Sequence, residues 1–155
     1  MKVKRDIHTY VGGPFRAHGN IEMWREGPIV RLRAQGPFNR EAVLGLGRAM
    51  SDLLAVDPPP AAFGDILELR GSMMTSPDSM QELERFLQKM GQERSPPVAV
   101  AYVADAGVEG RDLMLPLFEA MYLKQGRRFA SFESLEAARA WIQTQLADVA
   151  GTDGT

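Results

Sequence analysis

The segment Val98 to Ala104 is the feature that most limits what this chain can fold into. It reads VAVAYVA, carries no charged residue, and follows the helix-breaking run Ser95-Pro96-Pro97. An unbroken apolar strand is typical of the interior of a parallel sheet, where helices cover both faces. The segment therefore predicts an interior strand with helices packed on either side of it.

Strand and helix patterns alternate around this segment. Residues 20–35 alternate apolar and polar side chains on either side of the turn Arg25-Glu26-Gly27-Pro28, which predicts an antiparallel hairpin. Further strands are expected at Phe63 to Leu69 and Arg128 to Phe132. Helical spacing of apolar residues is present at residues 39–57, 76–91, 111–124 and 135–146. The expected fold class is α/β, with a mixed, mostly parallel sheet of about five strands, the N-terminal antiparallel hairpin and four helices.

The length of 155 residues is enough for one domain with its own core. We expect an irregular N-terminal segment at 1–19, in which His8 to Val11 is a candidate edge strand, a single domain at 20–148, and a flexible tail at 149–155. A formal net charge of -2 argues against a nucleic-acid binder. Cysteine is absent, so disulfides and thiolate chemistry are excluded. Without a secretory signal or an apolar run that could cross a bilayer, a cytoplasmic location is expected.

A cluster of polar residues between Ser72 and Ser79 has two interpretations. In the first, it only starts a helix: Ser76 caps the orphan amides, Pro77 takes the first helical position, and Asp78 faces the positive end of the dipole. In the second, it belongs to the edge of the sheet where the strand-to-helix loops of a parallel sheet converge. The candidate partner or ligand rim is then Asn39, Ser72, Thr75, Ser76, Ser79, Asp105 and Glu109.

The segment Asp112 to Leu123 is apolar on more than one stripe. Such a helix is either deeply buried or covered by something else. Burial within the monomer, a homodimer interface and an apolar ligand are the three alternatives. The candidate dimer or apolar ligand face is Leu115, Phe118 and Tyr122.

Catalytic patterns are weak. The stretch GLGRAM at residues 45–50 lacks the third glycine of a nucleotide-binding fingerprint and falls inside an expected helix. His8 and His18 have no carboxylate or serine at a recognised spacing, and two histidines are too few for a metal site. We therefore expect a non-catalytic protein without a metal or cofactor.

Four stretches together resemble a known family. They are the hairpin at 20–35, the turn Gly36-Pro37-Phe38-Asn39, the strand-to-helix joint at 67–79 and the closing RRFASFESLEAARAWI. They are similar to the STAS/SpoIIAA-like superfamily, in particular its small stand-alone bacterial branch, over residues 20–147.

The resemblance implies a mixed sheet wound with helices and a non-catalytic role in protein–protein regulation, as in anti-sigma factor antagonists. In those proteins a partner kinase phosphorylates a serine at the matching joint, so Ser76 and Ser79 are the implied candidate phosphoacceptors. The expected partner is another protein or a second copy of the chain. The alternative function is binding of a small apolar or anionic ligand.

Overall fold

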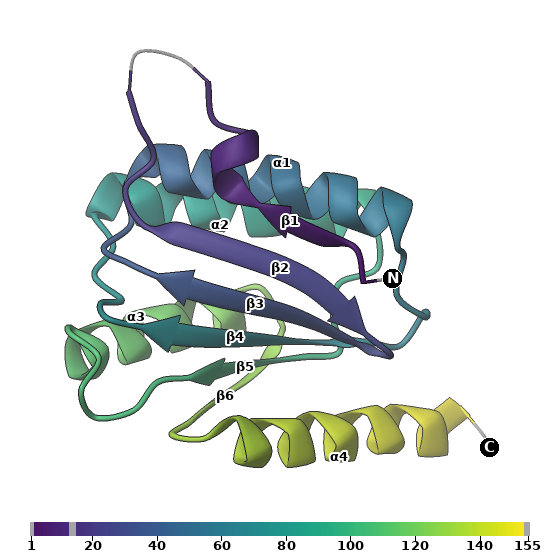
Figure 1. Cartoon of the computed structure of the whole chain (residues 1–155). Coiled ribbons are helices and arrows are strands. Elements are labelled where there is room, and N and C mark those ends of the chain that lie inside the picture. Colours follow the sequence, from purple (N-terminus) through teal and green to yellow (C-terminus); the bar gives the residue numbers. More distant parts are fainter. Residues whose placement is uncertain (1, 13–14, 154–155) are drawn as a thin grey trace.

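The computed structural model describes residues 2–12 and 15–153, which form one mixed sheet with helices on both faces (Figure 1). Six strands follow one another across the sheet in chain order. Their bounds are β1 (Lys4–Asp6), β2 (Asn20–Glu26), β3 (Ile29–Gln35), β4 (Gly64–Arg70), β5 (Ala99–Val103) and β6 (Arg128–Phe132). The first two pairings are antiparallel and the remaining three are parallel. The expected mixed, mostly parallel sheet with its N-terminal hairpin is confirmed.

The sheet has one strand more than the sequence predicts. β1 lies within the segment expected to be irregular, where Lys4, Arg5 and Asp6 pair with the outer edge of β2. Three residues are too few to show an alternating pattern, so the sequence carries no signal for this strand. The candidate edge strand at His8 to Val11 is wrong, because Ile7–Thr9 forms a 3-10 helix in which Asp6 accepts a hydrogen bond from the amide of His8.

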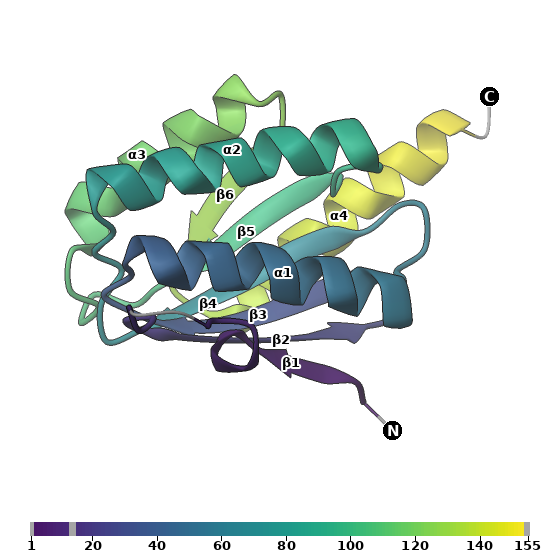
Figure 2. The same cartoon turned by 90° about the horizontal axis from the view of Figure 1, so that it is seen from above.

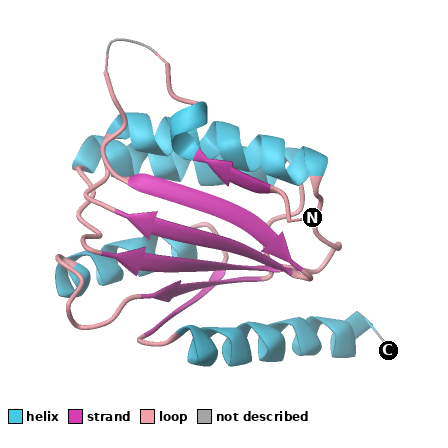
Figure 3. Cartoon of the chain, viewed as in Figure 1, coloured by secondary structure: helices cyan, strands magenta, loops and turns pink. Residues whose placement is uncertain are grey.

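Four α-helices connect and follow the parallel strands, as predicted. They are α1 (Arg40–Val56), α2 (Pro77–Glu93), α3 (Arg111–Lys124) and α4 (Leu135–Asp153). The first three share one hydrophobic core with one face of the sheet, and α4 packs alone against the other face (Figures 1 and 2). Figure 3 shows this layering of helices and strands. Among the described residues, no helix is long and apolar enough to span a bilayer.

The apolar segment that opened the sequence analysis is β5, and all five of its residues are buried. It lies between β4 and β6, one strand from the edge of the sheet. Ala99 and Ala101 contact α4 through the same small core as Ile142, whereas Tyr102 faces α3. Close approach of α4 also explains Gly64 in β4, because a Cβ atom there would lie 2.8 Å from Cγ2 of Ile142. The prediction of an interior strand covered on both faces is confirmed.

The residues predicted to begin and end the helices do so only in part. Asn39 caps α1 as predicted, since its Oδ1 accepts from the amide of Ala42 at 3.0 Å. Ser76 stands at the start of α2 but makes no side-chain capping hydrogen bond, so the predicted role of its hydroxyl is wrong. α2 also continues past Gly91 to Glu93. α4 continues through most of the expected tail to Asp153; the last two residues of that tail, 154 and 155, lie outside the described residues.

Candidate ligand cavity

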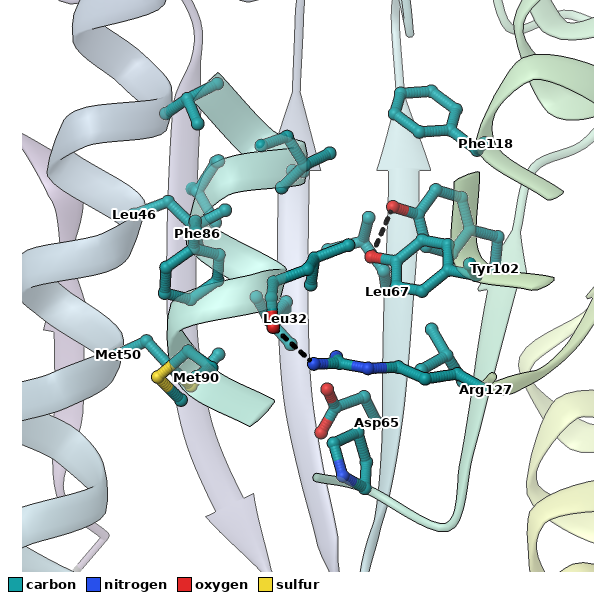
Figure 4. A pocket seen from close by; sticks show the side chains of 18 of the residues that line it. Leu32, Leu46, Met50, Asp65, Leu67, Phe86, Met90, Tyr102, Phe118 and Arg127 are labelled. Atoms are coloured by element: carbon teal, nitrogen blue, oxygen red, sulfur yellow. Dashed lines mark hydrogen bonds between the residues drawn. The ribbon is translucent and has the colours of Figure 1, made fainter. Parts of the chain in front are cut away.

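An apolar cavity lies between the sheet and the pair of helices α1 and α2 (Figure 4). Its volume is about 90 Å³. Its apolar lining includes Leu32, Leu46, Met50, Leu67, Leu69, Leu83, Phe86, Leu87, Met90 and Phe118. The side chains come from β3, β4, α1, α2 and α3, so the cavity is a product of the tertiary fold and not of any one motif.

The packing of α2 explains why this space stays open. α2 packs closely along α1 but makes no comparably close backbone contact with a strand. Phe86 of α2 lies against Gly47 of α1, where a Cβ atom would be 3.3 Å from the ring. Beneath the two helices, Leu67 lies in the middle of β4 and is only half-buried. A leucine at the centre of an interior strand is normally fully covered, so its exposed surface belongs to the cavity.

Asp65 is the one acidic side chain that lines the cavity. It shares the helix-facing side of β4 with Leu67 and Leu69, and part of it borders the cavity. Its Oδ1 atom is buried and has no hydrogen-bond partner among the described residues. Burial raises the pKa of Asp65 to about 7, and the nearby positive charge of Arg127 offsets only part of that rise. The carboxyl group is therefore poised between its neutral and charged forms near neutral pH.

Arg127 is the basic group at the same end of the cavity (Figure 4). It is buried, with 7% of its surface exposed. Its Nη2 donates to the backbone carbonyl of Leu87 at 2.9 Å, and no protein group in the described ranges accepts from its other two guanidinium nitrogens. No Asp65 oxygen lies within 4.0 Å of an Arg127 nitrogen, so the two groups face one end of the cavity without a direct ion pair.

Two buried tyrosines form part of the same wall. Their hydroxyls hydrogen-bond to each other at 2.9 Å, between Tyr102 of β5 and Tyr122 of α3. Burial raises the pKa of Tyr122 to about 12 and raises that of Tyr102 further. Both hydroxyls are therefore neutral at physiological pH, and each has the other as a hydrogen-bond partner.

The cavity reaches the surface beside the loop Ser95–Pro97. Ser95 and Pro96 line it and are nevertheless exposed. This loop precedes β5, Arg127 precedes β6, and Asp65 is the second residue of β4. The polar end and the mouth thus lie at the amino ends of the parallel strands. The rim predicted from the sequence lies at the opposite, carboxyl edge.

The predicted rim does form a continuous surface at that carboxyl edge. The amide of Gly36 donates to the Ser72 carbonyl at 2.8 Å, and the amide of Met73 donates to the Glu109 carbonyl at 2.9 Å. Strand-like bridges join Phe38 to Thr75 and Ser72 to Glu109. Three of the predicted loops therefore converge, bringing together the regions of Asn39, Ser72 to Ser79 and Asp105 to Glu109.

Polar side chains of the rim are largely engaged with one another. The Ser72 hydroxyl donates to Glu109 at 2.9 Å, and Thr75 donates to the Met73 carbonyl. The Ser76 hydroxyl lies 2.6 Å from that of Ser79 and 2.5 Å from Oδ1 of Asp78. Ser79 is fully buried, whereas Ser76 is exposed. Of the two candidate phosphoacceptors, Ser76 alone is accessible without opening α2.

The candidate face on α3 divides in two. Phe118 and Tyr122 point inward, are 4% and 7% exposed, and line the cavity, while Leu115 is half-buried. The apolar residues that α3 does present to solvent are Leu113, Leu117 and Leu123. Two of the three residues of the candidate face thus lie on the cavity side of α3, and its role as a dimer or apolar ligand face stays a prediction.

Asp65 and Arg127 were missed because each resembles an ordinary surface residue in the sequence. One signal was present: Asp65 shares the period-2 face of β4 with Leu67 and Leu69, which are apolar. A charged residue at an expected core position is an anomaly. No comparable signal marks Arg127, since its burial depends on how the loop before β6 packs beneath α2.

Within residues 2–12 and 15–153, no group of three or more His, Asp or Glu side chains is arranged to hold a metal ion. His8 contacts the Gly19 carbonyl at 3.0 Å. No protein-family model, curated protein or solved structure matches the chain. The function is therefore argued from the geometry alone.

Proposed function

We propose that the protein binds a small, mainly apolar ligand in the cavity between the sheet and helices α1 and α2. The observation that carries the proposal is the half-buried Leu67 at the centre of β4, whose exposed surface borders the cavity beneath α1 and α2. Ligand pockets in proteins are usually apolar and contain a few convergent polar groups. This cavity has that composition, with Asp65 and Arg127 at one end.

The energetics favour an occupant. An unfilled cavity costs about 24 cal/mol per Å³, so 90 Å³ corresponds to about 2 kcal/mol of lost stability. A ligand that restores those contacts recovers much of this energy. An engineered cavity of about 150 Å³ lined by Leu, Ile and Phe binds benzene, so a ligand of that size requires the lining of this 90 Å³ cavity to move.

The lining can also adapt to its occupant. Met50 of α1 and Met90 of α2 both line the space. Methionine has three rotatable bonds and fills irregular gaps, so these side chains can move to admit a body somewhat larger than the cavity.

Filling the cavity from within tests the proposal. We expect Leu67→Phe to occupy the space and abolish binding of hexan-1-ol, followed through amide chemical shifts, while the protein stays folded. Leu117→Phe is the matched control, because Leu117 is exposed on α3 and does not line the cavity. Equal responses of both variants and of the wild type to hexan-1-ol, or no response in any of them, would contradict the proposal.

A second candidate function is a regulatory, non-catalytic interaction domain of the STAS/SpoIIAA type, with the rim as its partner surface. The observation that favours it is the backbone hydrogen bonding that joins three loops into one surface around the exposed Ser76. A phosphate on Ser76 would be repelled by Asp78, which accepts its hydrogen bond at present.

We expect Ser76→Glu to lose a protein partner that the wild type retains in a pull-down from source lysate. Ser76→Ala controls for loss of the hydroxyl alone. Identical partners for wild type and Ser76→Glu would remove this candidate.

A further inference from the structure

We infer that the ligand is a small apolar carboxylic acid whose carboxyl group sits between Asp65 and Arg127. The inference rests on the proposed function, since it names the ligand class for the same cavity. It follows from which polar groups of the lining are still without partners, and from which single group could satisfy both of them.

Elimination leaves two polar groups. The lining contains six side chains with polar atoms: Asp65, Thr75, Ser95, Tyr102, Tyr122 and Arg127. The tyrosine hydroxyls bond to each other, Thr75 donates to the Met73 carbonyl, and Ser95 stands at the exposed mouth. Asp65 and Arg127 remain, the first with no hydrogen bond and the second with one, to Leu87, among the described residues.

A buried carboxyl oxygen without a protein partner is costly, which favours binding of a polar group at this end of the cavity. Asp65 and Arg127 are close enough for the arginine charge to act on the carboxyl, yet they do not pair directly. The missing group must accept a hydrogen bond from Arg127 and share one with Asp65. It must also carry an apolar body, because every other neighbour is apolar or already satisfied.

A carboxylate meets these requirements best. Its two oxygens match the planar donor fork of a guanidinium, which binds carboxylates more strongly than neutral acceptors. Its second oxygen can share a single proton with Asp65, as two neighbouring carboxyl groups do. With Arg127 positive and one proton shared by two carboxyls, the buried site is electrically neutral. An amine would be repelled by Arg127, and a phosphate dianion by Asp65.

Binding of the carboxylate is then coupled to the uptake of a proton. The pKa of free Asp65 is raised to about 7, so above that pH the complex must take one proton from solvent. The ionisable groups that line this end are Asp65, Arg127, Tyr102 and Tyr122, and both tyrosines stay neutral in this range. Asp65 is the one that titrates near neutrality. The affinity for a carboxylate should therefore fall about tenfold for each pH unit above 7.

The experiment compares hexanoate, hexan-1-ol and hexylamine, which share an alkyl chain and differ at the polar end. Dissociation constants are measured from amide chemical shifts between about pH 6 and pH 9. We expect hexanoate to bind at least tenfold more tightly than hexan-1-ol at pH 6, with the predicted loss above pH 7. Binding of hexan-1-ol should not depend on pH.

Two variants test the roles of Asp65 and Arg127 in binding the carboxylate. Asp65→Asn keeps a donor beside the ligand but cannot ionise, so it should bind hexanoate with little dependence on pH. Arg127→Leu should lose tenfold or more of its affinity for hexanoate while retaining hexan-1-ol. If Arg127→Leu does not fold, Arg127→Lys serves instead, since it keeps the charge and loses the planar fork.

The outcomes separate this inference from the proposed function. Equal, pH-independent binding of hexanoate and hexan-1-ol would overturn the carboxylate assignment and leave an apolar cavity that binds ligands. Preference for hexylamine would overturn it as well. Failure of all three probes to bind, with an unchanged response in Leu67→Phe, would remove the proposed function itself.

Discussion

Replacing Asp65 by asparagine gives the sharpest stability test of the cavity. Asparagine keeps the size of the side chain and resembles the neutral acid, but it cannot ionise. In the ligand-free protein, burial raises the pKa of Asp65 from 3.8 to about 7. The substitution therefore removes the ionisation of this group and leaves the rest of the cavity lining in place.

The magnitude follows from linkage. A rise of about three units corresponds to about 4 kcal/mol, since each unit is worth about 1.4 kcal/mol. Between pH 3.8 and 7 the folded protein holds a proton on Asp65 that the unfolded chain has released. The contribution of Asp65 to stability is therefore fully present below pH 3.8 and is lost as the pH rises toward 7. Asparagine cannot ionise, so the variant does not lose this stability as the pH rises.

The measurement is urea unfolding of wild type and Asp65→Asn across this pH range, with the difference in unfolding free energy as the readout. We expect the two proteins to be similar near pH 4 and the variant to be more stable by up to about 4 kcal/mol near pH 8. Other titrating groups cancel in the difference. A difference that stays constant from pH 4 to pH 8 would show that Asp65 ionises normally. The raised pKa of Asp65 at the polar end of the cavity would then be wrong.

Two further predictions concern the other face of the sheet. Gly64→Ala should lower the unfolding free energy by about 1–3 kcal/mol, because the added Cβ meets Ile142. In a double-mutant cycle with Ile142→Ala, the two losses of unfolding free energy should be less than additive. Additive losses would contradict the clash. Partial burial raises the pKa of Glu26, but hydrogen bonds from Trp24 and Arg139 lower it more, to about 2. Glu26→Gln should thus lower the unfolding free energy by about 2 kcal/mol at neutral pH, allowing for partial exposure of Glu26. In urea unfolding, this loss should become smaller as the pH falls from 4.5 toward 2. A loss that does not change with pH would refute the prediction.

The sequence by itself determined the class of fold and the order of elements from the hairpin onward. The uncharged run at 98–104 favours an interior strand because it is short and follows two prolines. Apolar periods of two and 3.6 residues indicate the hairpin and the helices, because each of these elements must bury one face. Asn39 caps α1 as predicted because capping depends on residues a few positions apart. Local patterns of this kind can be recognised from the sequence alone.

Tertiary structure alone decided where the candidate site lies. Phe86 of α2 packs on Gly47 of α1, a contact between two residues of different helices. The tertiary packing leaves Leu67 only half-buried and places Asp65 and Arg127, 62 positions apart in the chain, at one end of the same cavity. Burial of a charge depends on what packs over it from elsewhere in the chain. For that reason the sequence led to the carboxyl edge of the sheet, and the polar end of the cavity lies at the amino edge.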